Sequence, residues 1–491
     1  MKEICKSSER KTIIDLNFHK SILFKFLPLV ILLFASTFIY SQNSFQLFIS
    51  NNSFVATDRI LPFWFTANQQ GKIKPSGSFL NISDLYIGQE YKSKTDSKIG
   101  YTWGTDLIAA FGDNNYFQVN QAFAGFLFDG WEIKGGIFND ETKYSGLSTT
   151  NGNLAQSQNA RRVPAIRFST FGFKNFPFAK KWLSFYGEYE EGFLNDERYV
   201  DGAHLHHKSL YLKFKPAANW FFNIGFEHFV MWGGTSRNKN IGELPHGFDD
   251  YWRYILALPG DDSFQETDQL NSSGNQLGTY QFEIVKSFSK MEATFYLSHP
   301  FEDNSGLNWH NWPDNLLGLH LKIKKDNSFI TDILYEFTNT RQQSISDSIY
   351  WFDENSDKWK MREFDNYYNH GIYRSGFTYM QQTMSSPLFF PLKITDGISM
   401  GIRSNRFLAH HVGARGYFTE TFRWKGMLTY IQHLGTWSEP YKSSQNQFSG
   451  LFEVRFVKRG FPVELGVNTA GDFDKYKGKN LGFNILISKK W

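Results

Sequence analysis

The segment Leu481-Gly482-Phe483-Asn484-Ile485-Leu486-Ile487-Ser488-Lys489-Lys490-Trp491 decides the fold. Leu481, Phe483, Ile485 and Ile487 fall on every second residue, and successive side chains of a β-strand point to opposite faces. An alternating strand that ends in an aromatic residue is typical of transmembrane β-barrels, whose outer face contacts lipid and whose rings lie at the membrane surface. We therefore expect an all-β fold, a closed antiparallel transmembrane β-barrel.

The same alternation recurs along most of the chain. Leu210, Leu212 and Phe214 alternate with Tyr211 and Lys213, which puts one set on lipid and the other in the lumen. Barrels made from one bacterial chain have an even number of strands, so we expect about 18, with one assignment in excess. The candidate strands lie near 79–91, 98–110, 115–128, 130–139, 164–172, 181–191, 204–215, 219–230, 279–288, 290–299, 314–324, 329–339, 366–380, 397–405, 408–418, 422–432, 448–457, 461–469 and 480–491.

The connections between candidate strands have two lengths. Residues 215–219 and 458–460 are short, and barrels keep their short turns on the periplasmic side. An alternative is a soluble β-sandwich or propeller, in which the apolar face packs on a core instead of lipid. The long connections, which a barrel places outside the cell, are 140–163, 231–278, 340–365 and 381–396.

The N-terminal region predicts export. Lys20 and Lys25 precede the short apolar run Phe26–Ala35, and small or hydroxylated residues follow it. This pattern favours a signal peptide cleaved near Ser41, and hence the outer membrane of a Gram-negative bacterium; an uncleaved anchor is the alternative. We divide the chain into a signal peptide (1–41), an N-terminal periplasmic segment (42–75) and the outer-membrane barrel (76–491).

The composition agrees with a barrel and excludes other classes. Aromatic residues make up 18% of the chain, yet the mean hydropathy is −0.42. A barrel explains both values, because it alternates lipid-facing with lumen-facing residues and adds aromatic girdles. A formal net charge of +4 predicts no nucleic-acid partner. The single cysteine, Cys5, lies in the predicted signal peptide, so the mature chain has no disulfide or thiolate metal site.

The long connection 231–278 has the chemistry that sugar binding requires. It carries three basic and seven acidic residues, a charge of −4, together with several aromatic rings. Rings offer flat apolar faces, and carboxylates and guanidinium groups make directional hydrogen bonds to hydroxyls. Each residue could instead belong to an aromatic girdle or fold a plug. The candidate glycan-binding residues are Trp232, Arg237, Asp249, Asp250, Tyr251, Trp252, Arg253, Asp261 and Asp262.

Several motifs together resemble one protein family. They are Leu61-Pro62-Phe63-Trp64-Phe65-Thr66-Ala67-Asn68-Gln69-Gln70-Gly71, Met231-Trp232-Gly233-Gly234, Gly274-Asn275-Gln276-Leu277-Gly278-Thr279-Tyr280, Tyr368-Asn369-His370-Gly371-Ile372-Tyr373 and Asn405-Arg406-Phe407-Leu408-Ala409-His410-His411. In order and spread they resemble the capsule assembly protein Wzi family over nearly all of the mature chain. The resemblance implies an 18-stranded outer-membrane barrel, a small helical periplasmic element and a lectin-like role in holding capsular polysaccharide.

Metal sites receive little support from the sequence. His204 and His206 lie on one strand face at a spacing that could hold a metal, but no third ligand is evident, so lumen packing is the preferred interpretation. Asp261, Asp262 and Asp268 resemble a loose calcium loop without the spacing of an EF-hand. We expect no metal and no cofactor, and leave calcium in the loops open.

Catalytic sites receive as little support. Glu188, Glu190 and Glu191 could supply two acids for glycoside hydrolysis, but lumen acids commonly pair with lumen Lys and Arg. Ser298 and His299 are adjacent on a strand and therefore point to opposite faces, so they form no dyad. We expect a protein without catalytic residues.

The sequence thus predicts an outer-membrane protein that binds capsular or other surface polysaccharide through its extracellular loops and tethers or organises the capsule. The expected partners are that polysaccharide and outer-membrane lipid, and the expected state is a monomer. The main alternative is a diffusion porin, in which Lys213, Lys215, Glu188 and Glu190 would line a water-filled lumen. A third alternative is a surface enzyme that acts on glycan or lipid.

Overall fold

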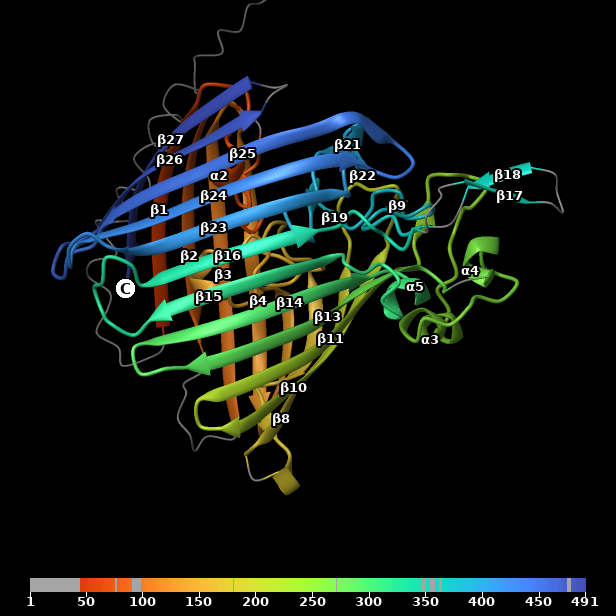
Figure 1. The fold of residues 1–491 in the computed structure, drawn as a ribbon, viewed down its shortest axis with the longest axis horizontal. Helices are drawn as coiled ribbons and strands as arrows, with labels where there is room; N and C mark the ends of the chain where they lie inside the picture. Colours follow the sequence, from red (N-terminus) through yellow and green to blue (C-terminus); the bar gives the residue numbers. More distant parts are fainter. Residues whose placement is uncertain are drawn as a thin grey trace, which may run out of the picture. The chain divides into compact units, whose positions relative to one another are not determined.

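The computed structural model describes residues 45–75, 77–90, 99–179, 181–270, 272–345, 350–353, 358–361, 364–474 and 478–491. Of the described residues, Trp491 belongs to a first unit and Phe45–Lys490 form a compact second unit. The predicted signal peptide lies outside the described residues and remains a prediction. The architecture below is that of the second unit (Figure 1).

Eighteen strands form one closed antiparallel barrel. Each strand pairs with the next along the chain, and β27 pairs with β1 to close the cylinder. A two-residue strand, β7 (Lys174–Asn175), adds to the edge of β8. The barrel strands are β1 (Phe45–Ala56), β2 (Phe79–Gln89), β3 (Ile99–Gly112), β4 (Tyr116–Phe128), β5 (Trp131–Ile137), β6 (Ala165–Thr170), β8 (Leu183–Phe193), β10 (His204–Ala217), β11 (Trp220–Trp232), β13 (Asn275–Ser287), β14 (Met291–Phe301), β15 (Asn315–Ile323), β16 (Asp332–Asn339), β23 (Phe407–Tyr417), β24 (Phe422–Gly435), β25 (Pro440–Phe456), β26 (Glu464–Asp474) and β27 (Gly478–Lys490).

The first strand was not expected. We assigned 42–75 to a periplasmic segment and began the barrel at residue 76, but β1 lies in the wall and runs antiparallel to β27 and β2. Its alternation is concealed because two positions on its outer face are polar. There Asn51 donates hydrogen bonds to Asn81 Oδ1 at 3.1 Å and Ser83 Oγ at 3.0 Å, so these side chains satisfy one another. An apolar period-two pattern therefore does not mark this strand.

Two of the expected strands do not belong to the wall. The segments 366–380 and 397–405 lie between β16 and β23, in a long connection that forms only short hairpins. Their aromatic residues, such as Tyr367 and Phe377, are fully buried among loops instead of alternating between lipid and lumen. The hairpins are β17 (Tyr350–Asp353) with β18 (Lys358–Met361), β19 (Thr378–Tyr379) with β20 (Gln382–Thr383), and β21 (Leu392–Thr395) with β22 (Ile398–Ile402).

The long connections all leave the barrel at one end, which is the extracellular end by the usual rule for these barrels. Figure 1 shows short helices there, near the ends of β11, β13 and β14. At the periplasmic end, where we expected a small helical element, the described residues contain no α-helix but one turn of 3-10 helix, Pro177–Ala179, between β6 and β8. The three helices at the extracellular end are α3 (Phe248–Ile255), α4 (Glu266–Leu270) and α5 (Asn304–Leu307).

Two connections fold into the lumen and form a plug, which we define as residues 57–78 and 138–164. The first contains α2 (Phe63–Thr66), in which the Trp64 indole donates to Thr429 Oγ1 on β24 at 3.2 Å and Phe63 N donates to Asp472 on β26 at 2.9 Å. In the second, Leu147 O accepts a 2.7 Å hydrogen bond from His411 Nε2 on β23. The segment expected in the periplasm therefore continues into the barrel interior.

The plug makes the largest buried apolar cluster of the described residues. Leu61, Trp64 and Phe65 of its first part join Leu147 and Leu154 of its second part, and the cluster continues into inward-facing strand residues. A barrel of this strand number would otherwise enclose a water-filled channel. The hydrophobic core of this protein thus lies inside the cylinder.

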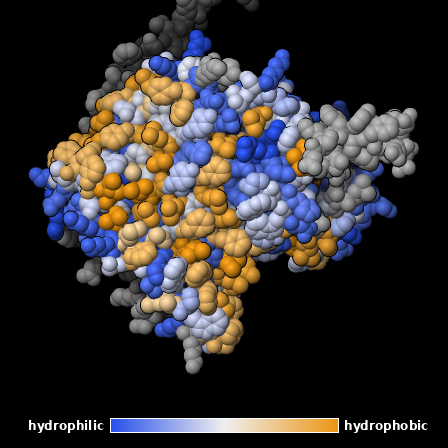
Figure 2. Space-filling view, in the orientation of Figure 1, coloured by the Kyte–Doolittle hydropathy of each residue, from blue (hydrophilic) through white to orange (hydrophobic). Residues whose placement is uncertain are grey.

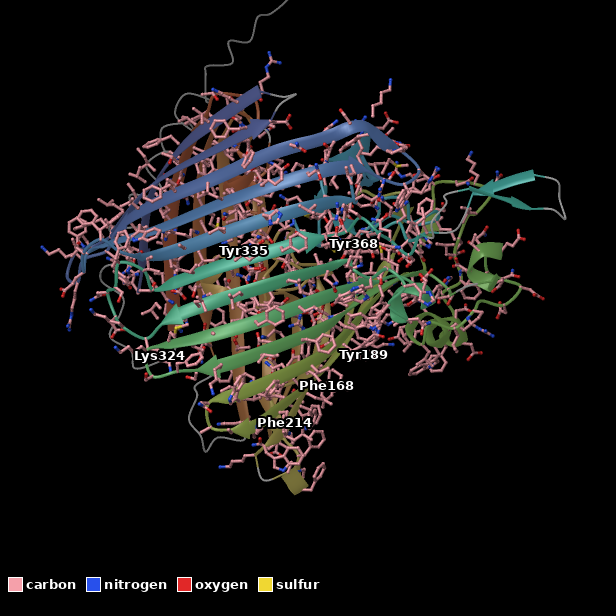
Figure 3. All side chains as sticks on the ribbon, in the orientation of Figure 1. Phe168, Tyr189, Phe214, Lys324, Tyr335 and Tyr368 are labelled. Atoms are coloured by element: carbon pink, nitrogen blue, oxygen red, sulfur yellow. The ribbon has the colours of Figure 1, made fainter. Side chains whose placement is uncertain are left out.

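The outer wall is covered by apolar side chains. Leu210 and Ile224 are exposed on the outer face of β10 and β11, as are Ile485 and Ile487 on β27. Figure 2 shows apolar residues spread over the barrel strands, and Figure 3 shows Tyr335 projecting from the wall. Among the described helices, none has the length and apolarity to cross a membrane. The exposed apolar side chains of the strands make the outer face of the wall apolar.

We expect Trp64→Ala to lower the free energy of unfolding by roughly 3–5 kcal/mol, because the change leaves a cavity in the plug core and removes the hydrogen bond to Thr429. Guanidinium unfolding of the refolded barrel, followed by its heat-modifiable gel mobility, measures the effect. Ile60→Ala is the matched control, since the Ile60 side chain is 47% exposed nearby. Equal unfolding midpoints for the two variants would contradict a plug that carries the core.

Candidate functional site

Two adjoining hollows open among the loops at the extracellular end. Their volumes are about 360 Å³ and about 250 Å³. They share a common rim, made by Asn366, Asn369, His370 and Gly371, which we call the central segment (366–371). Tyr368 of this segment is labelled in Figure 3 at the end of the barrel that bears the loops. A long flexible ligand that crossed the central segment would contact both hollows.

The central segment is held in place by side-chain amides. Asn369 Nδ2 donates to Ile402 O at 2.9 Å, and Asn369 Oδ1 accepts from Ile402 N at 2.6 Å. Asn405 Nδ2 donates to Asn366 Oδ1 at 2.6 Å. Gly401 has φ +90°, and a Cβ there would lie 2.4 Å from Asn369 Oδ1, so the close approach requires glycine. Two motifs that carry the family resemblance therefore build this segment.

His370 presents a donor to the hollows. Its Nδ1 accepts hydrogen bonds from Ile372 N and Tyr373 N, both at 3.2 Å. Burial lowers the pKa of the His370 imidazole to about 4, so the ring is neutral at physiological pH. The remaining ring proton must then be on Nε2. A neutral donor of this kind suits a hydroxyl or carboxylate oxygen.

The larger hollow is cationic. Arg374, Lys393 and Arg403 line it and are exposed, against one lining acid, Glu439. Lys393 Nζ lies 3.3 Å from Glu439 Oε1, whereas the Arg374 guanidinium lies 5.3 Å above the ring of Tyr199. Guanidinium groups bind carboxylates through paired hydrogen bonds. This hollow can therefore accept an anionic group.

Two hydroxyl side chains complete the lining of the larger hollow, next to an aromatic residue in the sequence. Thr436 and Ser438 line it, and Trp437 stands between them in the sequence. The Arg406 guanidinium lies 3.3 Å from the centre of the Trp437 ring, and the Phe364 ring lies 6.4 Å from it. Stacking by Arg406 holds the indole in one orientation. The lining of the hollow thus combines hydroxyl groups and cations.

The smaller hollow is acidic. Glu302, Asp303 and Asp365 line it, together with residues at the end of the 233–274 connection. Asp365 Oδ2 accepts a 2.6 Å hydrogen bond from Ser344 Oγ, and Glu302 accepts one from Tyr368 N. Burial raises the pKa of the Asp365 carboxyl to about 7, and the nearby Asp303 charge adds to the shift. No group of three or more acidic, histidine or cysteine side chains in the described ranges is arranged to hold a metal ion.

The nine predicted glycan residues lie elsewhere, in the connection 233–274 and its first strand end. Trp232 is packed in a cluster of rings: it stacks on His204 at 4.5 Å and meets Tyr251 at 5.1 Å. Tyr251 itself shares hydrogen bonds with Tyr189 and donates to Glu191 on the outer face of β8. The connection therefore folds back over the outside of the barrel wall.

Most of the charged residues among the nine hold this fold. Asp250 Oδ2 accepts from Gly247 N at 2.8 Å and caps α3, while Arg237 Nε donates to Arg198 O at 3.1 Å. Arg253 donates to Pro259 O at 3.0 Å and lies 3.5 Å from Asp261. Three of the nine have exposed side chains: Asp249, Trp252 and Asp262.

The other titratable candidates are paired in the wall. His207 lies in the lumen 3.0 Å from Glu188, whereas His204 and His206 face outward. Arg167 lies 2.6 Å from Glu190 and 3.3 Å from Glu188. These acids therefore form the lumen ion pairs that we considered as the alternative to a hydrolytic site. The buried Asp268 accepts a 3.0 Å hydrogen bond from Gly274 N and shapes the loop, whereas Asp261 and Asp262 are exposed.

Ser298 and His299 face opposite sides of β14, as expected. Ser298 Oγ accepts from Leu154 N of the plug at 3.1 Å. The His299 ring stacks on Trp309 outside the barrel, 4.0 Å away.

Sequence analysis missed the basic residues of the larger hollow. Arg374, Lys393 and Arg403 lie on separate segments, and no local spacing connects them. The signals for the region were the motifs Gly274–Tyr280, Tyr368–Tyr373 and Asn405–His411, which indicated the family resemblance but did not predict a rim.

Comparison with known proteins supports the assignment of the chain. The family described as Capsule assembly protein Wzi matches residues 53–390. The chain belongs to this Wzi family. Its structure is similar to that of Wzi from Escherichia coli, described as an outer-membrane protein involved in group 1 capsule assembly and a carbohydrate-binding β-barrel, with 13% identity, a TM-score of 0.56, and coverage of 96% of this chain and 88% of that one. This Wzi-family chain is an outer-membrane β-barrel protein.

Two further solved structures are more distant. OccK5 (OpdH) from Pseudomonas aeruginosa is 9% identical, with a TM-score of 0.47, and covers 91% of this chain and 97% of its own. OprD from Pseudomonas aeruginosa is 7% identical, with a TM-score of 0.46, and the match covers 92% of this chain and 95% of OprD. No curated protein sequence matches the chain.

We expect the central segment to loosen as the pH rises from about 5 to about 8. The Asp365 carboxyl binds its proton more tightly in the folded loop than in the unfolded chain, so its contribution to stability is fully present at acid pH and is lost as the pH rises through about 7. Amide hydrogen exchange of 364–371, corrected for the intrinsic rate, measures the change.

Asp365→Asn is the control for this titration. It should reduce the pH dependence and leave the part that comes from Glu302, whose pKa burial also raises. Slower exchange at high pH, or an unchanged dependence in Asp365→Asn, would contradict this assignment.

Proposed function

We propose that this Wzi-family protein binds a surface polysaccharide at the two hollows of its extracellular end and so tethers or organises a capsule. Two facts support the proposal: membership of a capsule assembly family, and the fold shared with an E. coli protein described as carbohydrate-binding. The observation that carries it is the cationic hollow lined by Arg374, Lys393 and Arg403 beside the donor side chains of the central segment. This chemistry suits a polysaccharide with carboxylate groups.

Binding would be multivalent. A single sugar unit in either hollow makes only a few hydrogen bonds, but a repeating chain that leaves one hollow finds the next unit at high effective concentration. The end of the 233–274 connection contributes Ser272 and Gly274 to the smaller hollow, and the start of β13 contributes Asn275 and Gln276. In this proposal Asp249 and Asp262, which lie on the connection and line neither hollow, offer further acceptors for sugar hydroxyls, while the contacts of Arg237, Asp250 and Arg253 shape the connection.

The remaining parts of the proposal concern turnover and partners. The protein binds without chemical turnover, since its most prominent carboxylates are held by lumen arginines or by loop hydroxyl and backbone groups. Its membrane partner is outer-membrane lipid against the apolar wall, and it acts as a monomer. Product release from purified polysaccharide would refute the first point.

Neutralising the cationic hollow should weaken binding. We expect Arg374→Gln, Lys393→Gln and Arg403→Gln each to reduce affinity for an anionic surface polysaccharide by about 10-fold, since each removes one charge-assisted hydrogen bond worth about 1.5 kcal/mol or more. The loss should shrink at high salt. Binding of the detergent-solubilised protein to polysaccharide extracted from the producing cells and fixed on a sensor surface measures it.

Lys458→Gln and Arg459→Gln form the matched control, because these exposed cations lie on a turn at the opposite end of the barrel. They should leave the affinity unchanged. A triple variant of the cationic hollow with wild-type affinity would disprove the site.

The alternative is a diffusion porin, and one observation favours it: a polar cavity of about 390 Å³ remains in the lumen, lined by Lys72, Asp84, Lys425 and Glu453 among others. The plug opposes it, because its two segments join strands on several sides of the barrel. We expect the protein to stay electrically silent in planar bilayers. Deletion of 140–160 should produce steps of conductance, whereas steps in the intact protein would favour the porin.

A further inference from the structure

Helix α3 lies against the outside of the barrel wall. Tyr251 reaches Glu191 and Tyr189 on the outer face of β8, and Lys208 on β10 donates a hydrogen bond to Ile255 O. Tyr254 and Phe264 pack on Val230 of β11 as a separate small apolar cluster. The 233–274 connection therefore covers the same surface that faces lipid further along these strands.

The helix lies at a sharp change in the chemistry of that surface. On the outer face of β10, His204, His206 and Lys208 are followed by Leu210 and then by Leu212 and Phe214, which are exposed. On the neighbouring β11, Lys208 is opposite His228 and Leu210 is opposite Phe226, while Val230 and Trp232 beyond His228 are covered by the 233–274 connection. On β10, one step of the ladder thus separates a polar band from the apolar belt. Such a step marks the boundary between headgroups and hydrocarbon.

The exposed side of α3 is divided into two flanks. Phe248, Trp252 and Leu256 follow one another at intervals of four residues and lie on one face, with exposures of 76%, 44% and 57%. Asp249 and Arg253 lie on the neighbouring face and are polar. Tyr254 and Ile255 are buried against the wall. Exposed apolar side chains on one face of a helix are unfavourable in water. They are favourable where that face contacts lipid.

A second connection repeats this arrangement on the adjacent strands. The Trp309 ring stacks on Tyr280 of β13 at 5.5 Å and on His299 of β14 at 4.0 Å, both on the outer face. Trp312 follows, 54% exposed and 5.9 Å from Trp309. Tryptophan is enriched at membrane interfaces, where its ring contacts hydrocarbon and its N–H reaches water.

We propose that α3 and the Trp309–Trp312 turn form an interfacial collar that rests in the outer leaflet of the membrane. Phe248, Trp252, Leu256 and Trp312 enter the lipid at the boundary between acyl chains and headgroups. Continuity with the lipid-facing wall carries the proposal, because the collar begins where the apolar belt of β10 and β11 ends. The collar extends the membrane contact of the wall beyond the point where the outer face of β10 becomes polar, and it anchors the loops that flank the hollows. It does not depend on the proposed glycan function.

Site-specific labelling tests the collar. In a Cys5→Ser background, which has no other cysteine, Trp252→Cys, Phe248→Cys and Asp249→Cys are each labelled with an environment-sensitive dye. The protein is placed in phosphatidylcholine nanodiscs, both faces of which are open to solvent. We expect dyes at 248 and 252 to emit at shorter wavelength and to be quenched at least 3-fold more strongly by nitroxide-labelled lipid than by aqueous iodide. The dye at 249 should show the reverse preference.

The matched position 249 separates the proposal from its rivals. Equal quenching ratios at 248, 252 and 249 would overturn it. Protection of 252 from both quenchers would indicate a second copy of the chain, and protection from iodide only after polysaccharide is added would indicate a glycan contact; either result overturns the collar. Phe248 makes little contact, so Phe248→Cys keeps the test valid if Trp252→Cys misfolds, as heat-modifiable gel mobility would reveal.

Discussion

Closure of the sheet is the constraint on which the rest of the structure depends. Inside a bilayer each backbone N–H and C=O must find a partner within the protein, and a sheet achieves this only when its first and last strands pair. Here β1 and β27 make that pair, from Phe48 opposite Lys490 to Ala56 opposite Gly482. A closed cylinder of this width leaves a lumen to be filled and a rim on which long connections can be arranged without breaking the ladder.

The lumen and the rim are filled by the same connections. Leu154 of the plug accepts a 3.0 Å hydrogen bond from Tyr368 of the central segment, and Ser157 donates to Ser385 O at 2.7 Å. The position of the hollows therefore rests on the plug, and the plug rests on inward-facing strand residues such as Ser298. A rigid interior of this kind preorganises a surface site, because the loops that line it lose little freedom when a ligand binds.

The wall was predictable and the loop site was not. Alternation locates most of the strands, because the apolar residues at every second position of a strand show which of its faces contacts lipid. It fails at β1, where Asn51 bonds to Asn81 and conceals the period. The loop 231–278 was chosen for its rings and acids, yet Tyr251 and Trp232 use those groups to pack on the outer wall. Composition identifies groups that could bind a sugar, but it does not say which of these groups are already engaged in contacts that hold the fold together.

The sequence by itself determined the barrel, its approximate strand number and the end that carries the long connections, because period and loop length are local properties. Tertiary structure alone decided that residues 57–78 enter the lumen, that α3 lies outside the wall, and that Arg374, Lys393 and Arg403 line one hollow. These arrangements depend on contacts between residues far apart in the chain. Such contacts follow from which surfaces remain to be buried once the cylinder has closed, and no local pattern encodes that.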